Sequence, residues 1–586
     1  MSAIIIEGVP QPSNEPSQEL KKDEYTSQTP GASPGQDSDA EEEYVDIPLT
    51  LEALDSSFSI SELLRARGFG HSGWADALAK GNPKFGSPFE WSTAKKTVIL
   101  SGPFVACTLA AYSAGSYAMP SQLLMREWNV GPTVFNIGIT MFVLGFGIAP
   151  MILAPFSENY GRYWVFAIAG TIFFLGTLGC AVTSSLAGML ISRFVTGCGA
   201  SVFATLTAGV VSDIYHKQHR NTPMTLYALT VLVGTGLGPL ISGVVVDELG
   251  WRWVFYLQMI MLGATTLEII LFFSETRNNV ILKRMCSALN SCPETLVEGN
   301  TSPHPGGKEV EATTGDRLPS RPNSKNNGRP RRIRFSVQVV QQKISVAVIW
   351  RSFAFPLRLL ATESVVFWFS AWVSFAWAIL YLQFNSIGIV FRETYGFTTT
   401  QIGAVSTSVI IGSVLVGVVN ITREPILCRI WPERMATPEG RLLPACVEST
   451  FLPIGLFWFG WSAGAHAPWI VPVFAIGACT VGIFSIYLAV FNYFADTYHR
   501  YASSALAAQS MCRNLLAGIF PLVTHMMFHN LSYGVAGSLL GAIGFLLTAV
   551  PWLLCIFGET VRSRSPFAMD LKAGDVDEAE RRDSVG

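Results

Sequence analysis

The sequence contains few charged residues for its length. Asp, Glu, Lys and Arg make up 14% of its 586 residues, whereas hydrophobic residues make up 50%. Soluble proteins contain about 25% charged residues, and a chain of this size with fewer cannot cover its surface with polar groups. The net charge of -2 also provides no basic excess for binding nucleic-acid phosphates. These shortages exclude a soluble protein and a nucleic-acid-binding protein, and they indicate an integral membrane protein.

Sequence signatures of catalysis, metal binding and ATP hydrolysis are also missing. The ten cysteines form no CxxC pair and lie mostly in apolar runs, where cysteine acts as a small hydrophobic residue. Segment 306–309 (GGKE) lacks the spacing and the Ser/Thr of a phosphate-binding loop. The pairs His216/His219 and His525/His529 have no partner set for a metal. We therefore expect no enzyme activity, no cofactor, no metal and no ATP-driven pump.

Twelve apolar segments of about 20 residues dominate the chain after residue 96. A helix rising 1.5 Å per residue crosses about 30 Å of hydrocarbon in that length. The first 90 residues are polar and contain no removable signal peptide, so the first spanning helix is expected to direct targeting. The predicted spans are 97–119, 133–154, 163–183, 188–211, 222–246, 252–273, 364–386, 399–421, 448–466, 469–494, 503–528 and 532–557.

The spans fall into two sets of six, which predicts an all-α integral membrane fold with two six-helix bundles, 97–274 and 364–557. A cytoplasmic linker, 275–363, separates the bundles, and the tails are 1–96 and 558–586. Both tails and the linker are rich in polar residues and have too little apolar surface to offset the entropy of ordering. We therefore expect them to be largely disordered.

The short loops have an uneven distribution of basic residues. With a cytoplasmic N-terminus, the loops on the inner side contain most of the Arg and Lys, as the positive-inside rule requires. This predicts a multi-pass protein, in the plasma membrane, with both termini in the cytoplasm. The inner residues are Arg162, Lys217, Arg220, Arg423, Arg429, Arg434, Arg441 and Arg500, and the outer ones are Arg126, Arg252 and Arg392.

The two halves repeat a short pattern. Asp213-Ile-Tyr-His at the end of the fourth span recurs as Asp496-Thr-Tyr-His at the end of the tenth, 283 positions later. Equivalent bundles whose helices run in the same direction are typical of transporters that rock about a central site. Chance similarity of four residues is the alternative interpretation.

The loop between the second and third spans, 154–162, reads APFSENYGR. Glu158, Gly161 and Arg162 in so short a loop can latch neighbouring helices in one conformation and release them in another. The loop resembles the GxLSDRxGRR signature of the major facilitator superfamily, although Glu158 replaces Asp, Asn159 the first Arg, and Tyr163 the last basic residue.

The fifth predicted span contains closely spaced small residues: Gly234, Gly236, Gly238, Pro239 and Gly243. Such glycines let helices touch backbone to backbone, and the proline bends the helix, so the segment can act as a stiff pivot. The pattern resembles the antiporter motif of the superfamily's drug:proton exporters, which implies export rather than uptake. Generic small-residue packing is the alternative.

Two arginines interrupt apolar runs. A charge within a span costs a few kcal/mol and should face the bundle interior. The family resemblance implies a role in proton coupling for Arg193, and a structural arginine bonded to carbonyls is the alternative. Arg513 poses the same choice, and we favour a structural role for it.

Four acids are candidates for carrying the proton: Asp213, Glu268, Glu363 and Asp496. Asp213 and Asp496 lie at equivalent helix ends, which favours gating. Glu268 is the one acid clearly inside a predicted span, where burial would make it titratable, although it could equally lie near the inner headgroups.

Patches of the sequence from Trp91 to Ala568 are similar to the twelve-helix fungal drug:proton antiporters, among them Glu275-Thr-Arg and 438–442 (PEGRL). The resemblance implies a secondary active transporter that exports drugs, toxins or secondary metabolites by proton antiport with alternating access. An importer or facilitator of the same fold, or a transporter-derived nutrient sensor, is the alternative. The expected partners are small-molecule cargo, protons and the lipid bilayer, with a monomer sufficient for function.

The cargo path is expected to be lined by aromatic and amide side chains on the inward faces of the helices. A roomy aromatic cavity with few charges suits apolar or amphipathic organic solutes. Some of these residues could instead belong to a lipid-facing aromatic belt. The candidates are Tyr112, Asn136, Tyr227, Trp377, Tyr381, Asn385, Tyr487 and Asn492.

Overall fold

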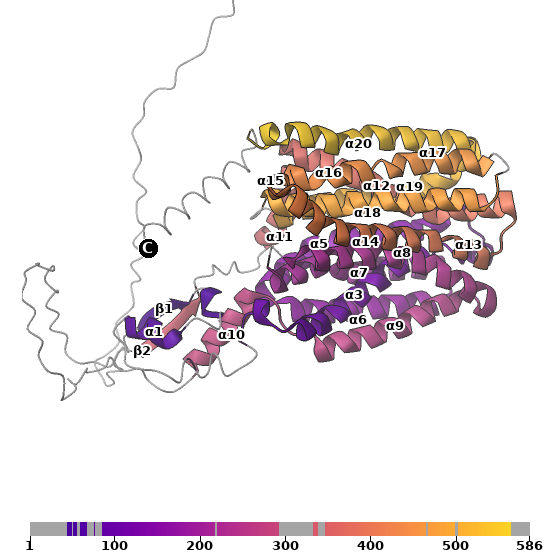
Figure 1. Ribbon diagram of the computed structural model, residues 1–586. Coiled ribbons are helices and arrows are strands. Elements are labelled where there is room, and N and C mark those ends of the chain that lie inside the picture. The colour runs from indigo at the N-terminus through magenta and orange to yellow at the C-terminus, as the bar shows by residue number, and fades with distance from the viewer. Residues whose placement is uncertain are drawn as a thin grey trace, which may run out of the picture.

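The computed structural model shows a long helical bundle with a smaller group of elements at one end (Figure 1). We call that end the linker end and the opposite one the far end. The structure describes residues 44–49, 51–54, 59–66, 76, 85–216, 219–291, 332–337, 346–464, 467–498 and 502–563.

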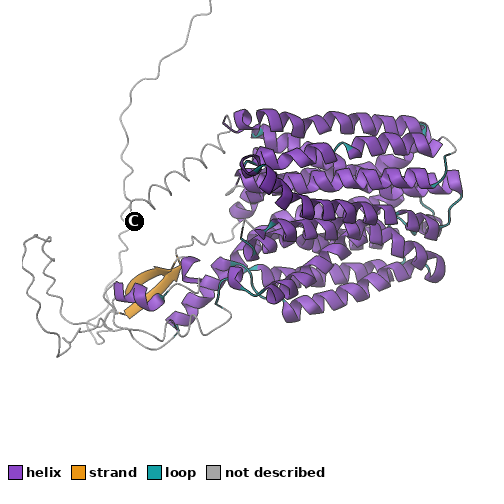
Figure 2. Ribbon diagram, viewed as in Figure 1, coloured by secondary structure: helices purple, strands orange, loops and turns teal. Residues whose placement is uncertain are grey.

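The bundle is helical throughout (Figure 2), and the described residues include 12 helices or helix pairs long and apolar enough to cross a membrane. This confirms the predicted all-α membrane fold. The first six are α3 (Thr93–Ser116), α5 (Pro132–Tyr160), α6 (Arg162–Val182), α7 (Leu186–Ile214), α8 (Asn221–Leu249) and α9 (Trp251–Phe272), with the short α4 (Ser121–Trp128) between α3 and α5.

The second six begin after α11 (Val346–Thr362). Two of the spans are split into two helices, and the short α15 (Pro432–Ala436) connects them. The spans are α12 (Ser364–Tyr395), α13 (Thr399–Val405) with α14 (Thr407–Ile430), α16 (Pro438–Glu448) with α17 (Phe451–Gly464), α18 (Ile470–Tyr498), α19 (Ala502–Asn530) and α20 (Tyr533–Ser563).

Local sequence explains several helix ends. Thr398 and Gln401 form a reciprocal capping box at the start of α13. Gly396 ends α12 in the left-handed conformation, with φ of 67°. Large apolar side chains on the outside of the bundle stay exposed, such as Leu546 at 72% and Phe545 at 69% on α20. Bare apolar surface of this kind is what a lipid-facing helix presents.

Equivalent helices pack alike in the two halves. The first span packs on the fifth in each half (α3 on α8, α12 on α19), and the third packs on the sixth (α6 on α9, α17 on α20). Contacts between the halves are also paired, α5 with α19 and α8 with α13 and α14. The two bundles are therefore related as the repeated sequence pattern predicts, and they meet along two seams.

The expectation that the tail and linker are largely disordered is wrong for their described parts. Strand β1 (Tyr44–Leu49) of the tail pairs in parallel with β2 (Arg332–Val337) of the linker, and α10 (Asn278–Asn290) packs on β2. Asn290 donates to the Phe335 carbonyl at 2.9 Å and accepts from its N–H at 2.8 Å. The apolar residues of each segment are few alone, but together they form a small core with η1 (Leu51–Leu54) and α1 (Ile60–Ala66). Residues 1–43, 292–331 and 564–586 lie outside the described residues.

Two spans extend further toward the linker end than predicted. α14 continues to Ile430, so Arg423 lies in a helix and not in a loop. The ninth span begins at Pro438, ten residues before the predicted start, because Thr437 caps the helix by accepting from the Gly440 N–H at 3.1 Å. Arg441, which was expected in a loop, therefore lies in α16, and Pro438 occupies the first turn, where proline is tolerated.

Candidate functional site

A cluster of aromatic rings surrounds a buried arginine between the two halves. The Arg513 guanidinium of α19 lies 4.7 Å from the Trp377 ring centre and 5.3 Å from the Tyr487 ring centre. The Tyr227 hydroxyl of α8 contacts the Tyr487 hydroxyl of α18 at 3.2 Å, across the seam between the halves. These residues, with Tyr381, line or border a cavity of about 20 Å³. The structure thus brings four predicted path residues together around Arg513.

The structural role that we favour for Arg513 stays a prediction, and its surroundings are as follows. It is 1% exposed, lines the central cavity, and within the described residues its Nε and Nη1 atoms have no hydrogen-bond partner. Buried polar groups normally have partners. Arg513 therefore lies at the central cavity with its guanidinium against the rings of Trp377 and Tyr487.

Arg193 is fully buried in the N-terminal half. It donates to the Ser113 carbonyl at 3.0 Å and to the Gly138 carbonyl at 3.4 Å, and its guanidinium lies over the rings of Tyr117 and Phe142 at 4.6 and 4.4 Å. No carboxylate among the described residues pairs with it. Arg193 thus has the carbonyl contacts of the structural alternative, yet it faces the bundle interior.

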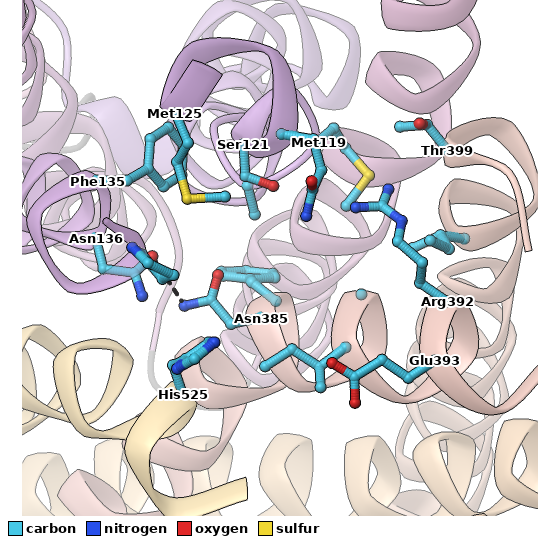
Figure 3. Close-up of a pocket in the computed structure, with 17 residues that line it drawn as sticks. Met119, Ser121, Met125, Phe135, Asn136, Asn385, Arg392, Glu393, Thr399 and His525 are labelled. Carbon is cyan, nitrogen blue, oxygen red and sulfur yellow. Dashed lines mark hydrogen bonds between the residues drawn. The ribbon is translucent and has the colours of Figure 1, made fainter. Parts of the chain in front are cut away.

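An amide bridge crosses the other seam toward the far end. Asn136 on α5 donates to the Pro521 carbonyl on α19 at 2.9 Å and accepts from Asn385 on α12 at 3.3 Å. Both amides line a cavity of about 140 Å³ that also includes Arg392 and His525. Figure 3 shows Asn136 and Asn385 directed toward each other, with His525 beside them and Arg392 across the cavity. We call this cavity the far-end vestibule.

The glycines of α8 form a close double seam. A methyl carbon placed on Gly238 would lie 2.6 Å from the Tyr112 carbonyl oxygen on α3. One placed on Gly243 would lie 2.8 Å from the Thr399 carbonyl oxygen and 3.2 Å from Gly403 on α13. Gly234 is equally close to the α3 backbone, and Pro239 lies inside the helix. α8 therefore touches both halves at backbone distance, as its sequence predicts for a pivot.

The predicted latch forms at the linker end, but with a different acid. Arg162 donates to Asp213 at 3.2 Å, and Arg277 donates to the other oxygen of Asp213 at 3.3 Å. Glu158 is exposed and pairs with no described residue. Arg162 and Asp213 are thus brought together from separate predictions, whereas Glu158 is not part of the contact.

Glu275 is a latch residue that the site prediction missed. It accepts from the backbone N–H of Arg162 at 2.9 Å and of Tyr163 at 3.3 Å, which caps the start of α6. Gly161 there has φ of 99°, and a side chain on it would collide with the Glu275 carboxylate. The signal was an acid two residues before Arg277, directly after the sixth span.

The remaining acids have separate surroundings. Glu268 on α9 is half-buried and accepts from the Ser101 hydroxyl at 2.7 Å, and it lies one turn from the linker end of its helix. Glu363 accepts from the Tyr498 hydroxyl at 3.3 Å. The Asp496 side chain lies outside the described residues.

Two predicted path residues lie away from the central cavity. The Tyr112 hydroxyl contacts Ser242 of α8 at 3.2 Å, inside the N-terminal half. Asn492 lines a separate crevice of about 50 Å³ toward the linker end, with Arg441 and Glu448. Glu448, which pairs with Arg423, is a second acid that the prediction missed, because both residues had been assigned to positions at or beyond the span ends.

Comparison with known proteins identifies the family. Residues 103–521 match the model of the Major Facilitator Superfamily. The chain belongs to this superfamily. The twelve spans and the family make it a multi-pass membrane transporter of small molecules and not an enzyme. The described residues contain no group of three or more His, Cys, Asp or Glu side chains placed to bind a metal.

The relatives of this superfamily member include fungal transporters. The chain is 30% identical to the MFS-type transporter phm3 of a Pyrenochaetopsis species, over 84% of this chain and 94% of that one. It is 28% identical to the multidrug transporter FLR2 of Candida glabrata, covering 84% and 79%, and 28% identical to fluconazole resistance protein 1 of Saccharomyces cerevisiae, covering 82% and 83%. The xylose transporter XylE of E. coli shares the fold, with a TM-score of 0.52 and 13% identity over 78% of this chain and 98% of XylE.

Proposed function

We propose that the chain exports small organic molecules in exchange for protons, by alternating access, as a monomer in the plasma membrane. In this proposal the linker end and both termini face the cytoplasm. The observation that carries it is the α8 seam, whose glycines touch α3 of one half and α13 of the other. The relatives named for multidrug transport and fluconazole resistance support the direction of transport.

The two seams define how the halves rock. Opening the far end requires α8 to separate from α13 and breaks the Asn136 bridge, which lies on the far-end side of the central cavity. Opening the linker end requires movement of the helices joined by the Arg162 and Asp213 latch. Packed interfaces of this kind have discrete arrangements and do not deform continuously. The cavity at Arg513 is then exposed to one side at a time.

The charges of the central region restrict the cargo. Trp377 and Tyr487 offer stacking faces, whereas Arg193 and Arg513 are buried cations without a paired carboxylate among the described residues. A cationic solute would meet uncompensated positive charge at low dielectric, which costs several kcal/mol. The site therefore favours neutral or weakly acidic amphipathic molecules.

The test is accumulation of a panel of neutral, acidic and cationic fluorescent compounds in yeast cells with and without the chain, each with and without a protonophore. We expect lower accumulation of neutral or acidic compounds, reversed by the protonophore. Gly238→Leu, expressed at equal surface level, is the inactive control because its side chain cannot fit against the Tyr112 carbonyl. Export that is insensitive to the protonophore would refute proton antiport, and uptake instead of export would establish the importer alternative.

A further inference from the structure

The C-terminal half contains a membrane-embedded carboxylate that takes no part in the gating contacts described above. Glu448, at the end of α16, is ion-paired with Arg423 of α14 and accepts a hydrogen bond from the Ser485 hydroxyl of α18 at 2.5 Å. Arg423 also donates to the Asn420 side-chain oxygen at 2.6 Å. The Glu448 side chain is 13% exposed. One carboxylate thus joins three helices of one half.

Glu448 lies within the span rather than at its edge. It is the tenth residue after Pro438, the start of α16, so it lies about 15 Å along the helix from the linker end. A charge at this depth is costly unless it is paired or hydrated. Its placement is therefore that of a functional group.

A narrow polar crevice connects Glu448 to the linker end. The crevice has a volume of about 50 Å³ and is lined by Pro438 and Arg441 near the start of α16, by Asn492 on α18, and by Glu448 itself. About 10–15 Å³ of such volume suffices for one water, so a short file of waters fits. Under the proposed orientation, this crevice gives Glu448 access to cytoplasmic protons.

The surrounding charged and titratable groups come from three helices. α14 contributes Arg423, α16 contributes Arg441, and α18 contributes Tyr493, all of which line the crevice. α20 also packs on α16, and there Cys555 contacts Cys446. On that side Cys555 also lies against the acid Glu439 of α16. Among the described residues that line the crevice, the charged and titratable groups other than Glu448 are thus two arginines and one tyrosine.

α18 links this carboxylate to the central cavity. Ser485, which bonds Glu448, is two residues from Tyr487, which stacks on Trp377 with ring centres 5.0 Å apart and contacts Tyr227 of the other half. Residues two apart on a helix point to different faces. The same turn of α18 therefore holds the carboxylate on one face and the cargo cavity on the other.

We propose that Glu448 is a proton-binding residue of the C-terminal half, and that a proton arriving through the crevice competes with Arg423 for its carboxylate. The inference rests on the proposed proton antiport and names a site for the proton. Binding of the proton neutralises Glu448, frees Arg423 to turn toward the crevice waters, and weakens the Ser485 contact that fixes α18. Glu448 acts as a positioning residue, because it reaches the cargo cavity only through α18.

The test is an infrared pH titration of the full chain in liposomes without cargo, from about pH 5 to about pH 8, a range in which folded proteins are generally stable. We expect the carbonyl-stretching band of protonated carboxyls to grow on acidification, and to grow less in Glu448→Gln than in the parent chain. Arg423→Gln should change the midpoint of that band, because the proton and Arg423 compete for the same carboxylate. Glu268→Gln is the matched control and should retain the Glu448 band.

Two outcomes would overturn the inference. A carboxyl band that persists unchanged in Glu448→Gln would show that Glu448 stays ionised, as in a permanent structural ion pair. A midpoint unaffected in Arg423→Gln would show no competition, and this arm remains informative if Glu448→Gln fails to insert. The titration contains no cargo, so its result does not depend on the export assay. Failure of proton-driven export in cells would refute the proposed function, whereas failure of the titration would refute only the role of Glu448.

Discussion

Replacing Gly243 with alanine should open the far end of the transporter. The added carbon would lie 2.8 Å from the Thr399 carbonyl oxygen and 3.2 Å from the Gly403 Cα atom. Both neighbours are backbone atoms, which cannot rotate away as a side chain would. Since Gly243 is on α8 and both neighbours belong to the other half, the collision acts on the contact between the halves and leaves each bundle intact.

The size of the effect follows from the distances. Restoring a separation near 3.5 Å requires α8 and α13 to move apart by roughly 0.5 Å. Overpacking of this kind costs about 1–3 kcal/mol. Because opening the far end separates α8 from α13 and removes this cost, the equilibrium between closed and open far ends shifts toward the open state by about 5- to 150-fold.

The assay is the rate at which a membrane-impermeant maleimide labels Ile389→Cys, a half-buried position that lines the far-end vestibule. Gly243→Ala should raise that rate, because labelling follows the open population. The matched control is Gly477→Ala on α18, where the added carbon meets its nearest atom at an ordinary 3.6 Å. Equal labelling of the two variants would refute the assignment of the α8 to α13 contact as the far-end seal.

The other predictions concern charge, hydrogen bonding and thiol chemistry. Asp213→Asn leaves the buried Arg162 without its carboxylate, so we expect the stability of the chain to fall by about 3–5 kcal/mol. The measurement is the melting temperature in detergent, which should be lower, and an unchanged melting temperature would contradict the latch. Arg193→Ala should uncouple export from the proton gradient, so that a protonophore no longer changes cargo accumulation, and an unchanged response would remove Arg193 from the mechanism. Burial raises the pKa of the Cys286 thiol to about 11 on α10 of the linker. Cys286 should therefore stay a protonated, slowly reacting thiol at neutral pH and gain reactivity only as the pH approaches 11. The exposed Cys428 should be labelled before it, and mass spectrometry of maleimide adducts distinguishes the two.

Hydropathy predicted the bundle because the bilayer imposes its length on every span. The start of α12 at Ser364 agrees with the predicted span, and the α8 glycines pack at backbone distance as their spacing implies. The predicted span boundaries were wrong where a helix continues through polar residues that are buried against other helices. Arg423 and Glu448 pair with each other, so a window that penalises charge ends the eighth span too early and starts the ninth too late.

The missed parts of the site depend on contacts between distant segments. Glu275 caps α6 from 113 positions away, and β1 pairs with a strand almost 300 residues later. A single sequence contains no period or spacing that specifies such pairs. The aromatic surroundings of Arg513 were missed for the same reason, because Trp377 and Tyr487 lie on two other helices.

The positions of the charges separate the proton site from the cargo site. The central cavity contains Arg513, whereas the nearest acid bonded to a cavity helix is Glu448, reached through Ser485. In the proposed mechanism, a proton on this acid does not displace cargo directly, and exchange operates through the position of α18. Thermodynamic linkage then requires reciprocity: whatever factor protonation of Glu448 applies to cargo affinity, bound cargo must apply to the proton affinity of Glu448. A rigid α18 satisfies this condition in both directions, because Ser485 and Tyr487 share one helical turn and neither can move without the other.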